Sequence, residues 1–155
     1  MTTTVSGLAE LAALTGRDLG ASGWLSITQE RVDRFADATG DHQWIHVDPE
    51  RARAGPFGTT IAHGYLTLSL VIPLWTELLT IEGIGMAVNY GLNKVRFPAP
   101  VAVGSRIRLA ARVAEARVVA GDGVEIVADL TVEVDGGAKP AAVAQAVYRY
   151  YAERR

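Results

Sequence analysis

Four side chains capable of acid–base chemistry lie close together in this 155-residue sequence. They are Asp41 and the three histidines of the chain, His42, His46 and His63. A carboxylate and an imidazole side by side can hold a water molecule and move protons to and from it. Since the chain contains no other histidine, any imidazole chemistry must occur between residues 40 and 64.

Asp41 and His46 form the most promising pair in this segment. Their spacing does not align them on one helical face, but Gly40 and Pro49 bracket them in a predicted loop, where a turn can bring both side chains together. The alternative is purely structural: Asp41 caps the turn and His46 is its polar neighbour. The spacing alone leaves both interpretations open.

A metal site is a further alternative, because His42 and His46 are four residues apart. No glutamate follows His42, no third ligand stands at helical spacing, and Gly40 and Pro49 limit any helix around them. We therefore expect no bound metal and no resident cofactor.

The segment Ala62-His63-Gly64 stands near the start of a long apolar stretch that we expect to be a helix. Backbone N–H groups at the start of a helix stabilise negative charge, and a glycine allows a substrate carbonyl to approach closely. Gly64 is thus a candidate oxyanion-binding residue, and His63 a candidate hydrogen-bond donor behind the pair. The alternative is that Gly64 is a small residue packed against a sheet.

The composition excludes several classes of function. The chain has no cysteine, which removes disulfides, thiol nucleophiles and cysteine-ligated zinc. Its net charge of −2 argues against nucleic-acid binding, which needs a basic surface. With 49% hydrophobic residues, a single domain over residues 1–155 can bury its own core.

We expect neither an export signal nor a membrane span. The N-terminus lacks a basic stretch and carries Glu10 within its apolar part, unlike a signal peptide. The most apolar segment, residues 61–81, is interrupted by His63, Pro73 and Glu77 and suits a buried helix better than a membrane span. We expect a cytoplasmic protein.

Helices are predicted in the first half of the sequence. Thr28 as an N-cap and Gly40 as a stop delimit an amphipathic helix. The segment Asp48-Pro49-Glu50 opens a short one. Thr59 or Thr60 is expected to cap the long apolar helix.

Strands are predicted from Ile84 onward. Between Val124 and Val134 apolar residues alternate with polar ones, the pattern of a strand with one buried face. In the preceding segment the alternation changes phase near Ala114, which indicates a β-bulge, and residues 121–123 supply a hairpin turn. Early helices followed by antiparallel strands predict an α+β fold, with the sheet curled around the long helix.

Several motifs resemble those of one enzyme family. They are Gly40-Asp41-His42-Gln43-Trp44-Ile45-His46, Asp48-Pro49, Ile61-Ala62-His63-Gly64 and Val95-Arg96-Phe97-Pro98. In this order they resemble the MaoC-like dehydratases, also called the hydratase 2 family, which are (R)-specific enoyl-CoA hydratases. The resemblance implies a hot dog fold, in which a curled antiparallel sheet wraps a central helix.

The resemblance also implies roles for the candidate residues. Asp41 and His46 would be the dyad that adds water across a trans-2-enoyl thioester, and the Gly64 N–H would polarise the thioester oxygen. Which member of the dyad is the acid stays open. Gln43-Trp44 replaces the family's usual Asn-Pro and resembles the nodulation protein N-like branch. A homodimer is expected by the same resemblance.

Three functions therefore remain open for this chain. The first is hydration and dehydration of thioesters carried by coenzyme A or an acyl carrier protein. The second is a hot dog acyl-CoA thioesterase, which would more often use an acidic base on the long helix, where Glu77 stands. The third is a non-catalytic acyl-thioester binding module.

Overall fold

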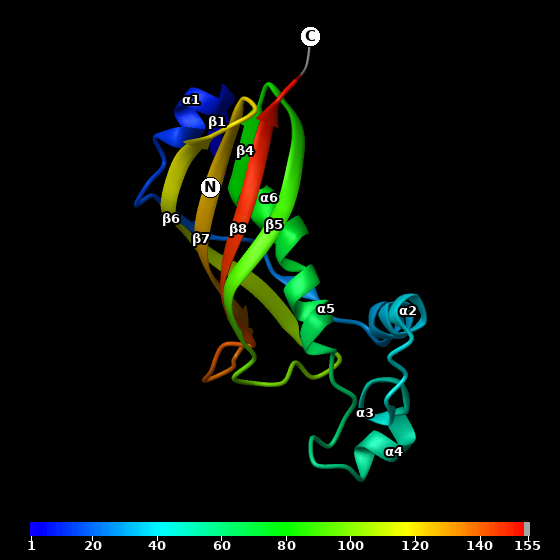
Figure 1. Ribbon diagram of the computed structural model, residues 1–155. Coiled ribbons are helices and arrows are strands. Elements are labelled where there is room, and N and C mark those ends of the chain that lie inside the picture. The colour runs from blue at the N-terminus through cyan, green and yellow to red at the C-terminus, as the bar shows by residue number, and fades with distance from the viewer. Residues whose placement is uncertain (154–155) are drawn as a thin grey trace.

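The computed structural model of the protein describes residues 1–153, which form an α+β arrangement (Figure 1). The main sheet runs in the order β2-β6-β7-β8-β5, with β3 also paired to β6, and every pair is antiparallel. Its strands are β2 (Asp18–Ala21), β3 (Leu25–Ser26), β5 (Ile84–Arg96), β6 (Arg106–Val119), β7 (Gly123–Val134) and β8 (Ala142–Ala152). A second sheet pairs β1 (Thr3–Ser6) with β4 (Leu79–Glu82) in parallel.

Apart from α1, the helices of the described chain fall into two groups. One group, α2, α3 and α4, follows β3 in the sequence and projects to one side of the main sheet (Figure 1). The other, α5 and α6, runs along one face of the main sheet. Their bounds are α1 (Gly7–Ala12), α2 (Gln29–Thr39), α3 (Trp44–Val47), α4 (Pro49–Arg53), α5 (Gly64–Ser69) and α6 (Val71–Leu78).

The predicted helix signals of the first half are confirmed. The Thr28 hydroxyl accepts a hydrogen bond from the Arg31 N–H at 3.2 Å, and Gly40 ends α2 in the left-handed conformation with φ of 77°. The Asp48 carboxylate caps α4 by accepting from the Arg51 N–H at 3.0 Å. Helix α2 therefore ends at Thr39, two residues before Asp41.

The predicted strand features are confirmed as well. The pairing of β6 with β7 shifts register between Val113 and Glu115, where the bulge was expected. Val124, Ile126 and Leu130 of β7 are buried, as the alternation predicts. The turn at residues 121–123 joins the two strands, with Asp122 at a φ of 54°.

The predicted start of the long helix is wrong. The helix begins at Gly64 with His63 as N-cap, whereas Thr60 is buried before it and donates its hydroxyl to Gln29 Oε1. The helix is also divided between α5 and α6. Pro73 has no N–H to donate to the carbonyl four residues earlier and its ring crowds that carbonyl, which interrupts the helix near Leu70.

The core lies between α6 and the main sheet. Leu74 and Leu78 of α6 are fully buried, as are Leu109 and Val113 of β6. The antiparallel sheet curled around a central helix confirms the predicted hot dog fold. No helix among residues 1–153 is long and apolar enough to cross a membrane.

Candidate active site

Asp41 lies in the turn that follows α2. Because Gly40 takes the left-handed conformation, the chain reverses there and leaves the Asp41 side chain exposed at the end of the helix. One carboxylate oxygen, Oδ1, lies 3.4 Å from the N–H of Gln43, which opens α3. The loop predicted between Gly40 and Pro49 is therefore confirmed around Asp41. It is wrong at His46, because residues 44–47 form the short helix α3.

His46 is buried in α3 and held by a backbone carbonyl. Its Nδ1 lies 2.7 Å from the Ile61 carbonyl oxygen, which can only accept a hydrogen bond. Nδ1 therefore carries the proton of the neutral ring. The lone pair is left on Nε2, so this nitrogen is the one that can accept a proton.

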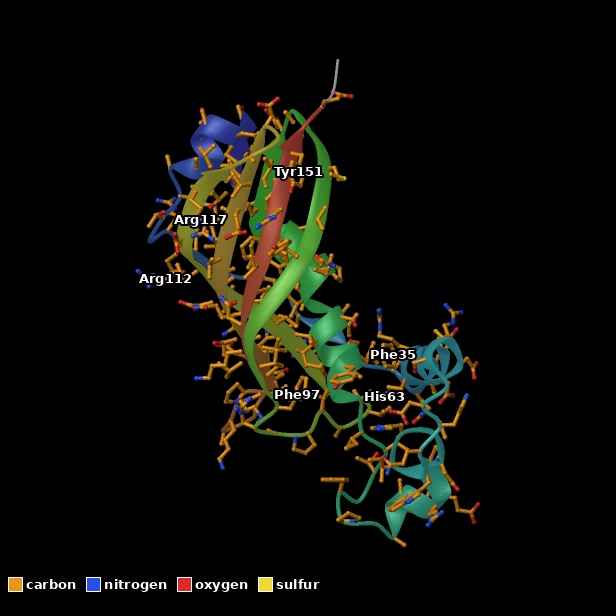
Figure 2. All side chains as sticks on the ribbon, in the orientation of Figure 1. Phe35, His63, Phe97, Arg112, Arg117 and Tyr151 are labelled. Atoms are coloured by element: carbon orange, nitrogen blue, oxygen red, sulfur yellow. The ribbon has the colours of Figure 1, made fainter. Side chains whose placement is uncertain are left out.

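His63 touches both members of the predicted pair. Its Nε2 donates to the backbone carbonyl of Asp41 at 2.9 Å, and its ring stacks on that of His46 with 3.8 Å between the centroids. Phe35 of α2 lies against the His63 ring, with 4.8 Å between centroids. Figure 2 shows Phe35 and His63 where α2 approaches the start of α5.

The structure thus brings three of the four candidate side chains together. Asp41, His46 and His63 each present an oxygen or nitrogen atom within 4.8 Å of those of the other two. His42 is separate: its ring is exposed, and Nε2 lies 3.7 Å from Asp37 Oδ1 on α2. The spacing of His42 and His46 does not reflect a shared site.

The stacked rings are poorly arranged for a shared metal ion. The lone pair of an imidazole lies in the plane of its ring, and a zinc ion binds about 2.0–2.1 Å from the nitrogen. The ring planes of His46 and His63 are 24° apart and lie face to face. Since such planes do not meet within bonding distance of both rings, the two lone pairs cannot converge on one ion.

The surroundings lower the pKa of His46 below its usual 6.5. Burial is the main cause, because it disfavours the charged ring, and the neighbouring His63 acts in the same direction. The hydrogen bond to Ile61 and the nearby Asp41 carboxylate oppose this shift. The ring is thereby kept neutral, which is the state that accepts a proton.

Gly64 is the first residue of α5 and lines a cavity with His46. The cavity has a volume of about 340 Å³, and its walls also include Phe57, Thr67 and Phe97. A Cβ atom on Gly64 would lie 3.1 Å from the Phe97 ring, which is tighter than ordinary packing. Gly64 is therefore both a small residue in a close contact and part of the cavity wall.

Two positions near the site escaped sequence reasoning. The Gln29 side chain donates from Nε2 to the His46 carbonyl at 2.7 Å and accepts from the Thr60 hydroxyl at 2.5 Å. A glutamine in the first turn of a helix and a threonine in a loop carry no local signal for such a role. Only their contacts identify them.

Glu77 has a structural partner instead of a place in the cluster. Its carboxylate accepts a hydrogen bond from the Gly23 N–H at 2.9 Å, near the end of α6. The cluster of Asp41, His46 and His63 lies at the opposite end of the helical segment, where α5 begins. The Glu77 carboxylate, which a thioesterase would use as its base, is thus hydrogen-bonded to the loop at Gly23.

Known proteins similar to this chain are consistent with the motifs. The protein-family model described as "MaoC like domain" matches residues 10–135. The 3-hydroxyacyl-thioester dehydratase Z of Mycobacterium tuberculosis is 56% identical over 149 residues, covering 96% of this chain and 99% of that protein. Nodulation protein N of Rhizobium leguminosarum bv. viciae is 42% identical over 139 residues, covering 88% and 86% of the two chains.

Solved structures are similar in fold. A MaoC-like dehydratase from Rhodospirillum rubrum superposes with a TM-score of 0.75, covering 96% of this chain and 99% of that one. The two sequences are 20% identical, so the likeness concerns the fold alone.

Proposed function

Because the chain belongs to the family of MaoC-like dehydratases, we propose that it adds water reversibly to trans-2-enoyl thioesters through Asp41 and His46. Its activity class follows from a named relative: at 56% identity to a 3-hydroxyacyl-thioester dehydratase, the chain is a dehydratase of the hydro-lyase class. The substrate, the dyad and the (R) configuration of the product are the proposed parts.

One observation carries the proposed dyad. An Asp41 oxygen and a His46 nitrogen lie within 4.8 Å of each other, and the hydrogen bond from His46 Nδ1 to Ile61 leaves Nε2 able to accept a proton. A water molecule between a carboxylate and such a nitrogen is oriented by both groups. Burial also lowers the pKa of His46, which keeps the ring in the neutral state that this role requires.

The proposed reaction needs two proton transfers. His46 Nε2 accepts one proton of the water as the water oxygen bonds to the β-carbon of the thioester. The dyad then delivers a proton to the α-carbon, so that its own protonation state is restored. The reverse sequence removes water from the 3-hydroxyacyl thioester.

Gly64 supports the binding of the thioester oxygen in this proposal. The first N–H groups of a helix have no partner within the helix, and Gly64 is the first residue of α5. The same cavity is lined by Gly64 and His46, so one bound thioester can meet both. A backbone N–H there would stabilise the enolate oxygen that develops as water adds.

A second cavity suits an acyl chain. It measures about 310 Å³, lies between α6 and β5, and is lined by Ile72, Trp75 and Tyr150 among others. Burial raises the pKa of Tyr150 to about 12, and its hydroxyl accepts from Trp75 Nε1 at 2.8 Å. The hydroxyl is therefore neutral and paired, which suits a hydrocarbon chain better than a charged group.

The test is hydration of crotonyl-CoA, followed as loss of the enoyl absorbance. We expect turnover by the wild type, and a fall of at least about 1,000-fold for Asp41→Asn or His46→Gln, since the reaction needs both proton transfers. His42→Gln is the matched control and is expected to keep wild-type turnover, because His42 lies apart from the cluster.

The same assay separates the alternative functions. A thiol reagent added in parallel detects the free coenzyme A that a thioesterase would release and a hydratase would not. Binding of crotonyl-CoA without loss of absorbance or release of thiol would indicate a binding module. Wild-type turnover in both dyad variants would disprove the roles of Asp41 and His46.

Removal of metal is expected to leave the activity unchanged. The proposed chemistry uses only side chains and a backbone N–H of the protein, and the stacked rings do not suit a shared ion. The measurement compares hydration rates before and after dialysis against a strong chelator. A loss of rate that added zinc or iron restores would overturn this part of the proposal.

A further inference from the structure

We infer that His63 is a positioning residue that holds Asp41 and His46 in their relative geometry through two separate contacts. This inference rests on the proposed dyad and deepens it. His63 itself has no assigned part in the proton transfers, although its side chain is 3% exposed and lies directly behind both proposed catalytic groups.

The first contact fixes the turn that carries Asp41. The Nε2–H of His63 donates to the Asp41 carbonyl oxygen at 2.9 Å, across 22 positions of sequence. The other hydrogen bonds of Asp41 are long: its Oδ1 accepts from the Gln43 N–H at 3.4 Å, and its own N–H donates to the Thr39 hydroxyl at 3.4 Å. The short bond from the Gly40 N–H to the Ala36 carbonyl, 2.8 Å, holds the end of α2 and not Asp41 itself. Without His63, Asp41 would keep only the two long hydrogen bonds among those that the described residues make.

The second contact fixes the ring of His46. The hydrogen bond to Ile61 constrains one edge of this ring but leaves it free to rock about that bond. The His63 ring lies on one face at a centroid distance of 3.8 Å, and Phe35 supports His63 in turn. The face-to-face contact removes the rocking motion and so aims Nε2.

The other ring nitrogen of His63, Nδ1, has no hydrogen-bond partner within residues 1–153, so an imidazole at this position carries an energetic penalty that the two contacts must offset. Among the residues that the structure describes, no group lies within hydrogen-bond distance of the buried His63 Nδ1. An unpaired buried polar atom destabilises the folded state, so an apolar ring would be favoured there if packing alone mattered. An imidazole offers both a flat face and an N–H at its edge, whereas a phenyl ring of similar size offers the face alone.

Two substitutions separate the two contacts. His63→Phe keeps a flat ring against His46 and removes the N–H, whereas His63→Gln keeps an N–H donor and removes the ring. We expect each to lower kcat by about 10–100-fold, because a displacement of about 1 Å at a reacting group costs rates of this order. The KM for crotonyl-CoA is expected to stay within about threefold.

The pH profile supplies a readout that a merely structural role would not move. The His63 ring opposes protonation of His46. In His63→Phe the acid-side limb of kcat/KM is therefore expected to move to higher pH. His42→Gln is again the control. Wild-type kcat in either His63 variant would overturn the two-contact arrangement.

A measurement on the unmodified protein does not depend on whether the variants fold. Nitrogen-15 NMR of labelled histidines distinguishes ring tautomers, and we expect Nδ1–H for His46 and Nε2–H for His63 near neutral pH. A His63 in the Nδ1–H or doubly protonated form would overturn the inference. Absence of hydration by the wild type, with the expected tautomers, would instead disprove the proposed function alone.

Discussion

The environment of His46 decides which of its atoms can do chemistry. In a neutral imidazole either ring nitrogen can carry the proton. In His46 the proton is on Nδ1, because this nitrogen lies 2.7 Å from the Ile61 carbonyl oxygen and must donate to it. Burial then keeps the ring neutral by lowering its pKa. These two effects together make Nε2 a base at the pH at which an exposed histidine would already be partly protonated.

The lowered pKa predicts the acid side of the pH profile. A base is active only when unprotonated, so kcat/KM for hydration should fall with an apparent pKa below 6.5. A histidine stabilised as a cation would instead have a raised pKa, and the inflection would lie above 6.5. Rates measured in buffers from pH 4.5 to 8 check this, and an inflection above 6.5 would contradict it.

Gln29 is expected to matter through its hydrogen bond to the His46 carbonyl. Gln29→Glu preserves the shape but replaces the donating Nε2 by an oxygen, which faces the carbonyl at 2.7 Å and repels it. The displaced α3 should lower kcat about tenfold. The added negative charge should also move the acid limb to higher pH, because it favours protonated His46.

Thr60→Val provides the comparison for this prediction. It removes the hydroxyl that Gln29 accepts from and adds no charge. Its pH profile should therefore keep the wild-type inflection even if kcat falls. Equal shifts of the inflection in both variants would show that charge at Gln29 is not the cause.

At the scale of elements, α3 depends on an aromatic contact. This four-residue helix has Gln43 at its N-cap, and within residues 1–153 no side chain caps it. The Trp44 ring instead lies under the Arg51 guanidinium, 4.5 Å from its centroid, and against Gly55. The replacement of the family's usual Asn-Pro thus coincides with a different way of holding the segment that carries His46.

Gly55→Ala tests this contact. The new methyl group would lie 2.9 Å from Trp44 Cζ3, so the indole and α3 must move. We expect kcat to fall about tenfold with a modest loss of melting temperature. Adding Trp44→Phe removes the clashing atoms and should restore part of the rate. A double variant no better than Gly55→Ala would contradict the mechanism.

On the outer face of the sheet, Glu125 links three strands. Its carboxylate, buried in β7, pairs with Arg117 of β6 at 2.5 Å and with Arg149 of β8 at 2.8 Å. The hydrogen bond from Arg149 is the main cause of a lowered pKa for Glu125, and Arg117 adds to it, although burial opposes the shift. The charged carboxylate is therefore the form that stabilises the sheet.

The sign of this shift predicts how stability depends on pH. A carboxyl group whose pKa is lowered by folding stabilises the folded state at pH values above its usual pKa of about 4.5. This contribution is lost as the pH falls below that value and through the lowered pKa. Glu125→Gln should lower the free energy of unfolding at pH 7 by about 2 kcal/mol and reduce the acid sensitivity. Urea unfolding at pH 7 and pH 3 measures both.

Glu133→Gln is the control for Glu125. Glu133 pairs with Arg108 at 2.6 Å on the same sheet, but 38% of its side chain is exposed, so its loss should cost less than about 1 kcal/mol. Equal costs for the two substitutions would show that burial of Glu125 adds nothing.

At the scale of the whole molecule, the exposed edge of the sheet predicts a dimer. Among the described residues, β5 pairs with β8 on one side only, and Met86, Tyr90 and Leu92 of this strand are about half exposed. A long edge strand with apolar side chains favours pairing with another chain. A second copy is the proposed partner, in line with the family resemblance.

Leu92→Glu is expected to give a monomer by light scattering. Leu92 is 47% exposed, so the substitution should leave the fold intact while placing a charge in the proposed interface. Val118→Glu is the matched control, because Val118 is 75% exposed on β6, away from the β5 edge. An unchanged dimer in Leu92→Glu, or a monomeric wild type, would contradict the prediction.

The sequence by itself determined those features whose signals are local. Caps at Thr28 and Gly40, the bulge near Ala114 and the alternation in β7 all depend on neighbours within a few residues, and all are confirmed. The pairing of Asp41 with His46 could also be predicted, because a turn between them is a local event and few other side chains could do the chemistry.

Only the tertiary structure decided the features that depend on distant neighbours. The tautomer of His46 is set by a carbonyl 15 positions away, and the turn of Asp41 is held by a ring 22 positions away. Thr60 was predicted to cap the long helix, but its hydroxyl donates instead to the side chain of Gln29 on α2. Periodicity and capping patterns record which face of an element is apolar and where it ends, but not which elements meet there.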